Sequence, residues 1–312
     1  QLDFDVAGDL AIEPIDIGFV NDLYFYQEAN LVNYTSVPNS IRIGKPGSPD
    51  PAFSNPTWTY LSGTHQAKGS ITVYGGKVTL QNNAQLTSLG TSADSDKQVR
   101  IEATRMIELG TGAKIRTKDV PIVLWTKTSE EITLGNSSEI LTTYDGANAS
   151  TGAAIYLGGG EAEVVSGLSV PAGYANSTAD NGVKFGTSSP ANVKIDSGEG
   201  NIRIKGSSSS STVGEAGLAT YGTGVSITST TGNIELVGRQ VTNSQAAAIQ
   251  FDDSPKISST NGSIEISADS SALSSSRPLI ESSGAEIIAT GTGNISITGE
   301  SATQSIDGVR LN

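Results

Sequence analysis

Four ten-residue segments in the C-terminal half of the chain share one pattern and recur at an almost constant spacing. Each begins with Ile, continues through Ser, Thr, Gly and Asn, and ends with two apolar residues separated by one other residue. The leading isoleucines, at steps of 32, 30 and 31 residues, are Ile195, Ile227, Ile257 and Ile288. A fixed period of this size indicates a repeat architecture, in which each repeat buries its apolar face against the next. We therefore expect these isoleucines to stack in one ladder.

Each segment predicts a strand, a tight turn and a second strand. Gly and Asn supply the positive-φ positions that tight turns need. We assign these turn positions to Asn201, Asn233, Gly262 and Asn294. The residues after the turn alternate apolar and polar, as in a strand with one buried face. The first buried residues of these second strands are predicted to be Ile202, Ile234, Ile264 and Ile295.

A third short strand precedes each of these segments, for example at residues 182–185, 217–220 and 248–251. In the N-terminal half, segments 107–115 and 132–140 match each other at a step of 25 residues. Three short strands in a unit of roughly 25–32 residues predict an all-β fold, a right-handed parallel β-helix. An antiparallel sandwich would instead place hairpin turns every 8–12 residues, without a period near 31.

The repeat pattern divides the chain into two parts. Residues 1–67 depart from it and are expected to form irregular coils or a cap, with a Pro-rich loop at Pro46–Pro56. Residues 68–312 are expected to form one continuous solenoid. The last repeat stops just after its first strand, as expected of a segment of a longer array.

Charge and composition exclude several classes of function. The net charge is −13, which disfavours nucleic acid and anionic membrane surfaces as partners. No apolar run is long enough to span a bilayer. Without cysteine there is neither a disulfide nor a thiolate metal site.

The chain opens at Gln1, so we expect that a leader or a larger preceding segment has been removed and that the protein is extracellular.

No residue pattern predicts catalysis, so we expect a protein that is not an enzyme. Asp252-Asp253 and the tripeptide 203–205 resemble two parts of pectin-type hydrolases, but in the wrong order. His65 is the only histidine, and we interpret it as a loop residue. No cofactor is expected.

Two weaker kinds of site remain open. Weak calcium binding could occur at coil corners through Asp196, Glu199 and Asp253. Aromatic rings on flat strand faces can stack on sugars, and the candidates are Trp58, Tyr60 and Trp125.

The pattern Gly-Asn-Ile-X-Ile-X-Gly, preceded by Ile-X-Ser-Thr, resembles the repeats of filamentous-haemagglutinin-like adhesins and related bacterial β-strand-repeat exoproteins. The resemblance covers most of residues 68–312 and implies export, surface attachment or filament formation. The Asn-Pro-Asn-type motif of the secretion domain of two-partner adhesins is not found. We expect a structural or adhesive solenoid whose partners are other copies, or glycans or proteins of a host or neighbouring cell. A carbohydrate-active β-helix enzyme and an ice- or surface-binding module stay open as alternatives.

Overall fold

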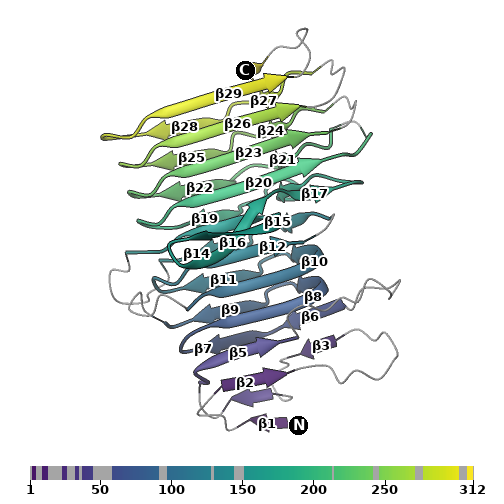
Figure 1. The fold of residues 1–312 in the computed structure, drawn as a ribbon, viewed down its shortest axis with the longest axis vertical. Coiled ribbons are helices and arrows are strands. Elements are labelled where there is room, and N and C mark those ends of the chain that lie inside the picture. The colour runs from purple at the N-terminus through teal and green to yellow at the C-terminus, as the bar shows by residue number, and fades with distance from the viewer. Residues whose placement is uncertain are drawn as a thin grey trace.

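The computed structural model describes most of the chain and arranges it as one stack of short strands. The described residues are 2–4, 9–12, 23–26, 32–34, 37–44, 58–90, 97–127, 130–143, 151–212, 214–241, 246–270, 277–301 and 308–311. They contain 30 strands, β1 to β30, and no helix. The strands lie one above another from the N-terminal to the C-terminal end (Figure 1). The fold is a parallel β-helix, as the sequence period predicts.

Each coil contributes strands to three faces of this stack. The first face consists of β2 (Asp9–Ile12), β5 (Ser40–Ile43), β8 (Ile71–Leu80), β10 (Val99–Leu109), β12 (Ile122–Thr126), β15 (Ile155–Val165), β20 (Ile202–Ser208), β23 (Ile234–Gln240), β26 (Ile264–Ser270) and β29 (Ile295–Ser301). The second face consists of β3 (Leu23–Tyr26), β6 (Trp58–Ser62), the second halves of β8 and β10, β13 (Ile132–Leu134), β18 (Val183–Phe185), β21 (Leu218–Thr220), β24 (Ile249–Phe251), β27 (Ile280–Ser282) and β30 (Val309–Leu311).

The third face is a separate sheet of eight strands. In chain order these are β7 (Thr64–Ala67), β9 (Gln85–Ser88), β11 (Lys114–Thr117), β14 (Glu139–Leu141), β19 (Lys194–Asp196), β22 (Ser226–Ser229), β25 (Lys256–Ser259) and β28 (Glu286–Ala289). Two short strands, β1 (Leu2–Phe4) and β4 (Val32–Tyr34), form a parallel pair of their own. Another short strand, β17 (Ala175–Ser177), pairs with the end of β20.

The corner between the first and second faces explains the two repeat lengths. In the N-terminal coils β8 and β10 run across this corner without a break, and a register shift between Ala103 and Met106 marks the bend. In later coils a loop separates the two faces, for example between β20 and β21. The longer period of the C-terminal repeats is due to these loops.

The third face contains the predicted isoleucine ladder, with one correction. Ile195 pairs with Ile227 and Ile227 with Ile257, and all three are fully buried. The partner of Ile257 in the last coil is Ile287, not Ile288, so the prediction for Ile288 is wrong by one residue. The turn after β28 is one residue longer than its predecessors, and Gly291 adopts a φ of 75° there.

The first face stacks Ile202, Ile234, Ile264 and Ile295 in register, in the order predicted. Ile202, Ile234 and Ile264, together with residues of the other two faces, belong to one hydrophobic core that extends from Ile41 to Ile280. The prediction that Ile295 is buried is wrong: Ile295 is 45% exposed, because β29 pairs with β26 on one side and no described strand covers its other side. In the last coil, Ile287 and Ile297 are only partly buried against this core. The interior is thus a single apolar column lined by all three faces.

The predicted Gly-Asn turns are present, but their physical basis differs from the prediction. The φ angles at Asn201, Asn233, Gly262 and Asn294 are not positive. Glycine is needed for another reason: a Cβ on Gly232 would lie 1.9 Å from the carbonyl oxygen of Gly200 in the preceding coil. The same close approach recurs at Gly262. We call this series, Gly200, Gly232, Gly262 and Gly293, the glycine column.

Two columns of side chains hold these turns together. Outside, the side-chain oxygen of Asn233 accepts a hydrogen bond of 2.8 Å from the backbone N–H of Ser263. Ser263 therefore takes the position that Asn201 and Asn233 occupy in their coils, and Gly262 belongs to the glycine column. Inside, the buried hydroxyl of Ser229 accepts from the Gly232 N–H at 2.9 Å and lies 3.1 Å from the Gly200 carbonyl oxygen.

The coil pattern begins upstream of residue 68. β7 pairs with β9, β5 with β8 and β2 with β5, all in parallel. Residues 1–67 therefore include strands that pair in parallel with the coils that follow. The Pro-rich stretch Pro46–Pro56 lies outside the described residues.

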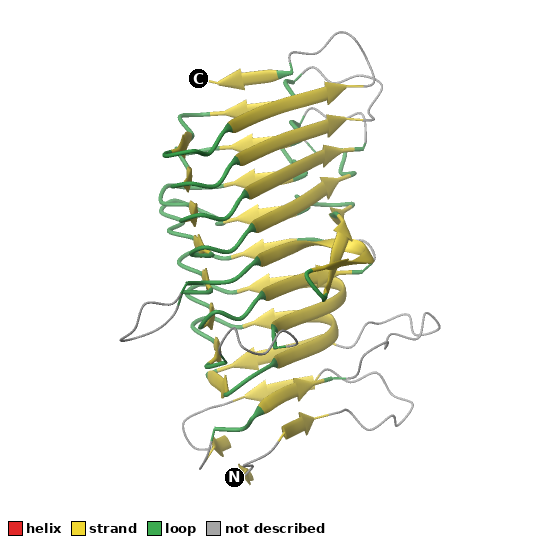
Figure 2. Ribbon diagram, turned by 60° about the vertical axis from the view of Figure 1, so that its left-hand side comes forward, coloured by secondary structure: helices red, strands yellow, loops and turns green. Residues whose placement is uncertain are grey.

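Among the described residues, an antiparallel hairpin projects from the solenoid without breaking the stack, because β15 still pairs in parallel with β12 and β20. β15 leaves the first face and pairs with β16 (Leu168–Gly173) through a turn with positive φ at Ser166 and Gly167. The hairpin lies on the outside of the stack, where its arrows cross the other strands (Figure 2). It covers a second, smaller hydrophobic cluster formed by Val123, Trp125, Tyr156, Leu168 and Val170. Among the described residues no helix is long and apolar enough to cross a membrane.

Candidate functional site

The residues that resemble parts of a pectin-type hydrolase lie on different faces. Arg203 belongs to β20 on the first face, where it donates a 2.7 Å hydrogen bond to the Pro171 carbonyl and lies 5.2 Å from the Tyr156 ring. It anchors the hairpin. Asp252 and Asp253 follow β24 on the second face, and Asp253 accepts a hydrogen bond from the Gly222 N–H. These residues do not form a common site.

His65 is a core residue, so its interpretation as a loop residue is wrong. It lies on β7, is fully buried, and pairs in register with Leu86 of β9. Its Nε2–H donates to the Ser62 carbonyl oxygen at 2.9 Å. Burial lowers the pKa of His65 from 6.5 to about 4, although the Ser62 hydrogen bond opposes this change. The ring is therefore neutral near pH 7 and fills a core position.

The predicted calcium candidates are engaged with the backbone or with a lysine. Asp196 accepts from the Gly198 N–H at 3.1 Å and lies 3.5 Å from the Lys194 ammonium. Asp253 accepts from the Gly222 N–H at 3.1 Å. Within the described ranges, no three His, Cys, Asp or Glu residues are grouped so that they could hold a metal ion. Glu199, the third candidate, therefore belongs to no such group either.

Threonine side chains do not form a regular array on the third face. Its outward positions in successive coils include Arg116, Leu141, Asp196, Thr228 and Ser258. An ice- or crystal-binding surface would need the same small hydroxyl side chain in coil after coil, and this column changes in size and charge.

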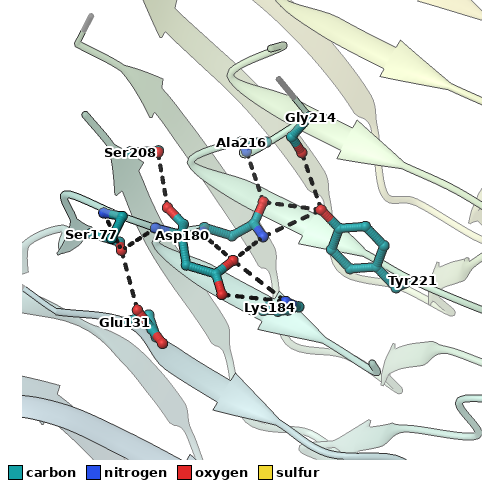
Figure 3. A network of polar contacts seen from close by, with 10 residues as sticks. Glu131, Ser177, Asp180, Lys184, Ser208, Gly214, Ala216 and Tyr221 are labelled. Carbon is teal, nitrogen blue, oxygen red and sulfur yellow. Dashed lines mark hydrogen bonds and ion pairs between the residues drawn. The ribbon is translucent and has the colours of Figure 1, made fainter. Parts of the chain in front are cut away.

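A polar network lies at the corner between the first and second faces (Figure 3). The Ser177 hydroxyl donates to Glu131 Oε2 at 3.1 Å and accepts from the Asp180 N–H at 2.9 Å. Asn181, which is 1% exposed, donates to Asp180 and accepts from the Ala216 N–H at 2.7 Å. These contacts connect segments that belong to successive coils.

The surroundings of the network shift the ionisation of two groups. Burial raises the pKa of Glu131, and the Asp180 carboxylate raises it further, while the Ser177 hydrogen bond opposes the change. Burial also raises the pKa of Tyr221, whose hydroxyl donates to the Gly214 carbonyl at 3.1 Å. Asp180 forms an ion pair with Lys184 at 3.4 Å. The network contains two carboxyl groups and a tyrosine hydroxyl, which are groups used in acid–base catalysis, but most of its polar groups are used in contacts within the fold.

Trp125 is unavailable to a glycan, so the prediction for this residue is wrong. It faces outward from β12 but is only 3% exposed, because the hairpin covers it. Its indole N–H donates to the Gly160 carbonyl at 2.9 Å. Arg100 lies 4.6 Å from its ring centroid and Lys127 lies 5.2 Å away. Trp125 is thus a structural residue beneath the hairpin.

Trp58 and Tyr60 present a different environment on the second face. They occupy alternate positions of β6, so both side chains point outward, and Trp58 is 37% exposed. Their ring centroids lie 5.6 Å apart, with 43° between the ring planes. The Lys77 ammonium lies 4.7 Å from the Trp58 ring centroid and 3.2 Å from Glu108. Thr79 donates weakly to the same carboxylate at 3.4 Å. We call these five residues the Trp58 strip.

The sequence contained signals for two features that the predictions missed. His65 lies 21 residues before Leu86, a spacing close to that of one short coil. The first strand of the hairpin, β15, contains Gly158-Gly159-Gly160 at the point where it leaves the first face. A Cβ on Gly159 would lie 2.3 Å from the Tyr174 carbonyl oxygen. These glycines admit the returning strand of the hairpin.

The fold and these surfaces define a parallel β-helix with a hairpin on its first face and an aromatic strip on its second face. Comparison of the chain with family models, with curated proteins and with solved structures gave no match.

Proposed function

We propose that this chain is a structural, adhesive segment of an extracellular bacterial surface or filament-forming protein. Its role is mechanical: a stiff β-solenoid holds adhesive surfaces at a distance from the cell and links them. Its partners are other copies of the chain, or glycans or proteins on a host or neighbouring cell. The protein is not an enzyme in this proposal.

The observation that carries the proposal is the unbroken parallel register along the stack. Backbone pairing on the first face continues from β2 to β29, and one hydrophobic core follows it. In such a rod successive coils are about 4.8 Å apart, and force along the axis is shared at each step by the hydrogen bonds that join the two coils on all three faces. The acidic, cysteine-free composition and the resemblance to filamentous-haemagglutinin-like repeats also support an exported, load-bearing role.

Electron microscopy of the native cell surface tests this proposal most directly. With antibody against the chain, we expect label on fibres or stalks that project from the cell, and purified protein should appear as short rods. Label confined to the cell interior would contradict the proposal. So would a purified protein that binds neither cells, glycans nor itself.

A carbohydrate-active enzyme is the second candidate, and the Glu131–Asp180 pair favours it. Glycoside hydrolysis uses two carboxylates in different environments, one of them with a raised pKa. Here Glu131 has the raised pKa, and Asp180 is paired with Lys184. This function requires reducing ends to be released from a polysaccharide by the full chain, with the release lost in Glu131→Gln. Activity that remains in Glu131→Gln, or no activity on a broad panel, would eliminate this pair as a catalytic site.

A further inference from the structure

We propose that the Trp58 strip binds a neutral glycan chain, with the two rings stacked on sugar rings and with Lys77 and Glu108 hydrogen-bonded to sugar hydroxyls. This inference rests on the proposed function, because it identifies the ligand through which an adhesive solenoid would attach. It assigns a role to Trp58 and Tyr60, and it excludes Trp125.

The first argument is the contrast between the two tryptophans of the chain. Both face outward from strands, and both have a cation next to the ring. Trp125 lies under the hairpin at 3% exposure, whereas Trp58 is 37% exposed at the start of β6. A tryptophan side chain buries a large apolar area when it is covered. Trp58 therefore keeps in contact with water an apolar surface that a ligand could remove from it.

The second argument is the shape of the strip. Tyr60 lies two residues after Trp58 on the same strand, so the two rings form a short row along the strand direction. In-register pairing places Lys77 of β8 beside Trp58 and Thr79 beside Tyr60. The next coil places Glu108 beside Thr79. The apolar row is thus bordered on one side by polar groups that lie on rigid, hydrogen-bonded strands.

The third argument is chemical complementarity with a sugar. A sugar ring has an apolar C–H face and a rim of hydroxyl groups, each of which both donates and accepts hydrogen bonds. The Trp58 strip offers aromatic faces, an ammonium donor and a carboxylate acceptor. Specific ligand sites generally combine apolar lining with a few convergent polar groups in this way.

Charge selects a neutral glycan over an anionic one. The Lys77 ammonium is already paired with the Glu108 carboxylate at 3.2 Å, so the strip carries no unpaired cation for a sulfate or carboxylate. The net charge of −13 also repels polyanions.

Affinity electrophoresis of the full chain tests the proposal. The gels contain a soluble β-glucan, a mannan or a galactan as neutral probes, or heparin as an anionic probe. We expect retardation in at least one neutral gel. Trp58→Ala should weaken the apparent Kd at least tenfold, equivalent to about 1.4 kcal/mol, and Trp58→Phe should keep it within about threefold. Tyr60→Ala should weaken binding as well. Val164→Ala, which removes an apolar group that is 75% exposed on the hairpin, is the matched control and should change nothing.

Three results would overturn the proposal: no retardation by any neutral polysaccharide, equal retardation of the wild type and Trp58→Ala, or retardation only by heparin. Each variant is first checked by circular dichroism for the β-rich spectrum of the wild type. The two proposals can fail separately. If antibody labels surface fibres but the strip binds no glycan, only the ligand assignment fails. If the chain is found inside the cell, the adhesive role fails whatever the gels show.

Discussion

The side-chain oxygen of Asn201 accepts a 2.8 Å hydrogen bond from the backbone N–H of Asn233, one coil further along the stack. The same bond runs from the Ser263 N–H to Asn233. In β-helices built like this one, the side chain of one coil satisfies the backbone of the next. A substitution of this side chain in one coil therefore removes a hydrogen bond from the backbone of the next coil.

The buried serine of the turn should matter more than the exposed asparagine. Ser229→Ala leaves the buried Gly232 N–H without its partner, and we expect a loss of about 1–3 kcal/mol in the free energy of unfolding. Asn233→Ala exposes the Ser263 N–H to water instead, so we expect only about 0.5–1 kcal/mol. Urea denaturation followed by circular dichroism gives both values. Equal losses of unfolding free energy in the two variants would show that burial does not determine how much each hydrogen bond contributes.

Gly232→Ala should be severely destabilising, because its Cβ would meet the Gly200 carbonyl oxygen at 1.9 Å and the backbone of both coils must move. We expect at least about 3 kcal/mol, at the upper end for overpacking. Gly308→Ala is the control, since its Cβ would be 3.7 Å from the nearest atom, the Gly299 carbonyl oxygen. Thermal denaturation should separate the two variants. Similar melting temperatures would refute the close-approach explanation of the glycine column.

His65 should make the protein less stable in mild acid. Its pKa is 6.5 in the unfolded chain and about 4 in the fold, so between these values the unfolded chain binds more protons. The free energy of unfolding therefore falls as pH falls from 6.5 to 4, by about 3 kcal/mol in total. His65→Leu, which copies its neighbour Leu86, should lack this contribution.

Comparison of the two proteins isolates the histidine. Glu131 and Asp252 have raised pKa values and change stability in the opposite sense, but they do so equally in the wild type and in His65→Leu. The quantity to measure is the difference in unfolding free energy at pH 4, 5, 6 and 7. A difference that does not vary with pH would show that His65 is not buried in its neutral form.

Replacement of the two tryptophans by alanine should change stability by very different amounts. Trp125→Ala empties the cluster under the hairpin and should cost about 3–5 kcal/mol locally. Amide hydrogen exchange in β16 should then accelerate. Trp58→Ala removes a partly exposed side chain and should change stability by about 1 kcal/mol or less. Slow exchange in β16 of Trp125→Ala would mean that the remaining contacts, the pairing with β15 and the Arg100 and Arg203 hydrogen bonds, are enough to hold the hairpin.

The period of the isoleucines predicted the fold because stacking leaves a direct mark on the sequence. Ile195, Ile227 and Ile257 lie in register since the turns between β19 and β20, β22 and β23, and β25 and β26 align position by position. The same reasoning selects the wrong residue in the last coil. Alignment on its Gly-Asn pair selects Ile288, whereas the extra turn residue shifts the ladder to Ile287.

Features that depend on contacts between distant segments could not be predicted in the same way. Trp125 occupies an outward position, and only the hairpin that folds back from β15 buries it. His65 is a polar residue at a core position, and although its spacing from Leu86 indicates a coil, its residue type does not indicate burial. The proximity of Trp58, Lys77 and Thr79 could not be predicted from the sequence either, because it depends on the register between β6 and β8.

The glycine column also limits how a molecule of this kind can change in length. At each of these turns the backbone of one coil fills the space beside the next, and the longest connection in this series, after β28, contains only one extra residue. The corner between the first and second faces already differs from coil to coil and is where added residues can go. A lineage of such proteins would thus grow or shrink by complete coils, in increments of about 4.8 Å, while the cross-section stays constant.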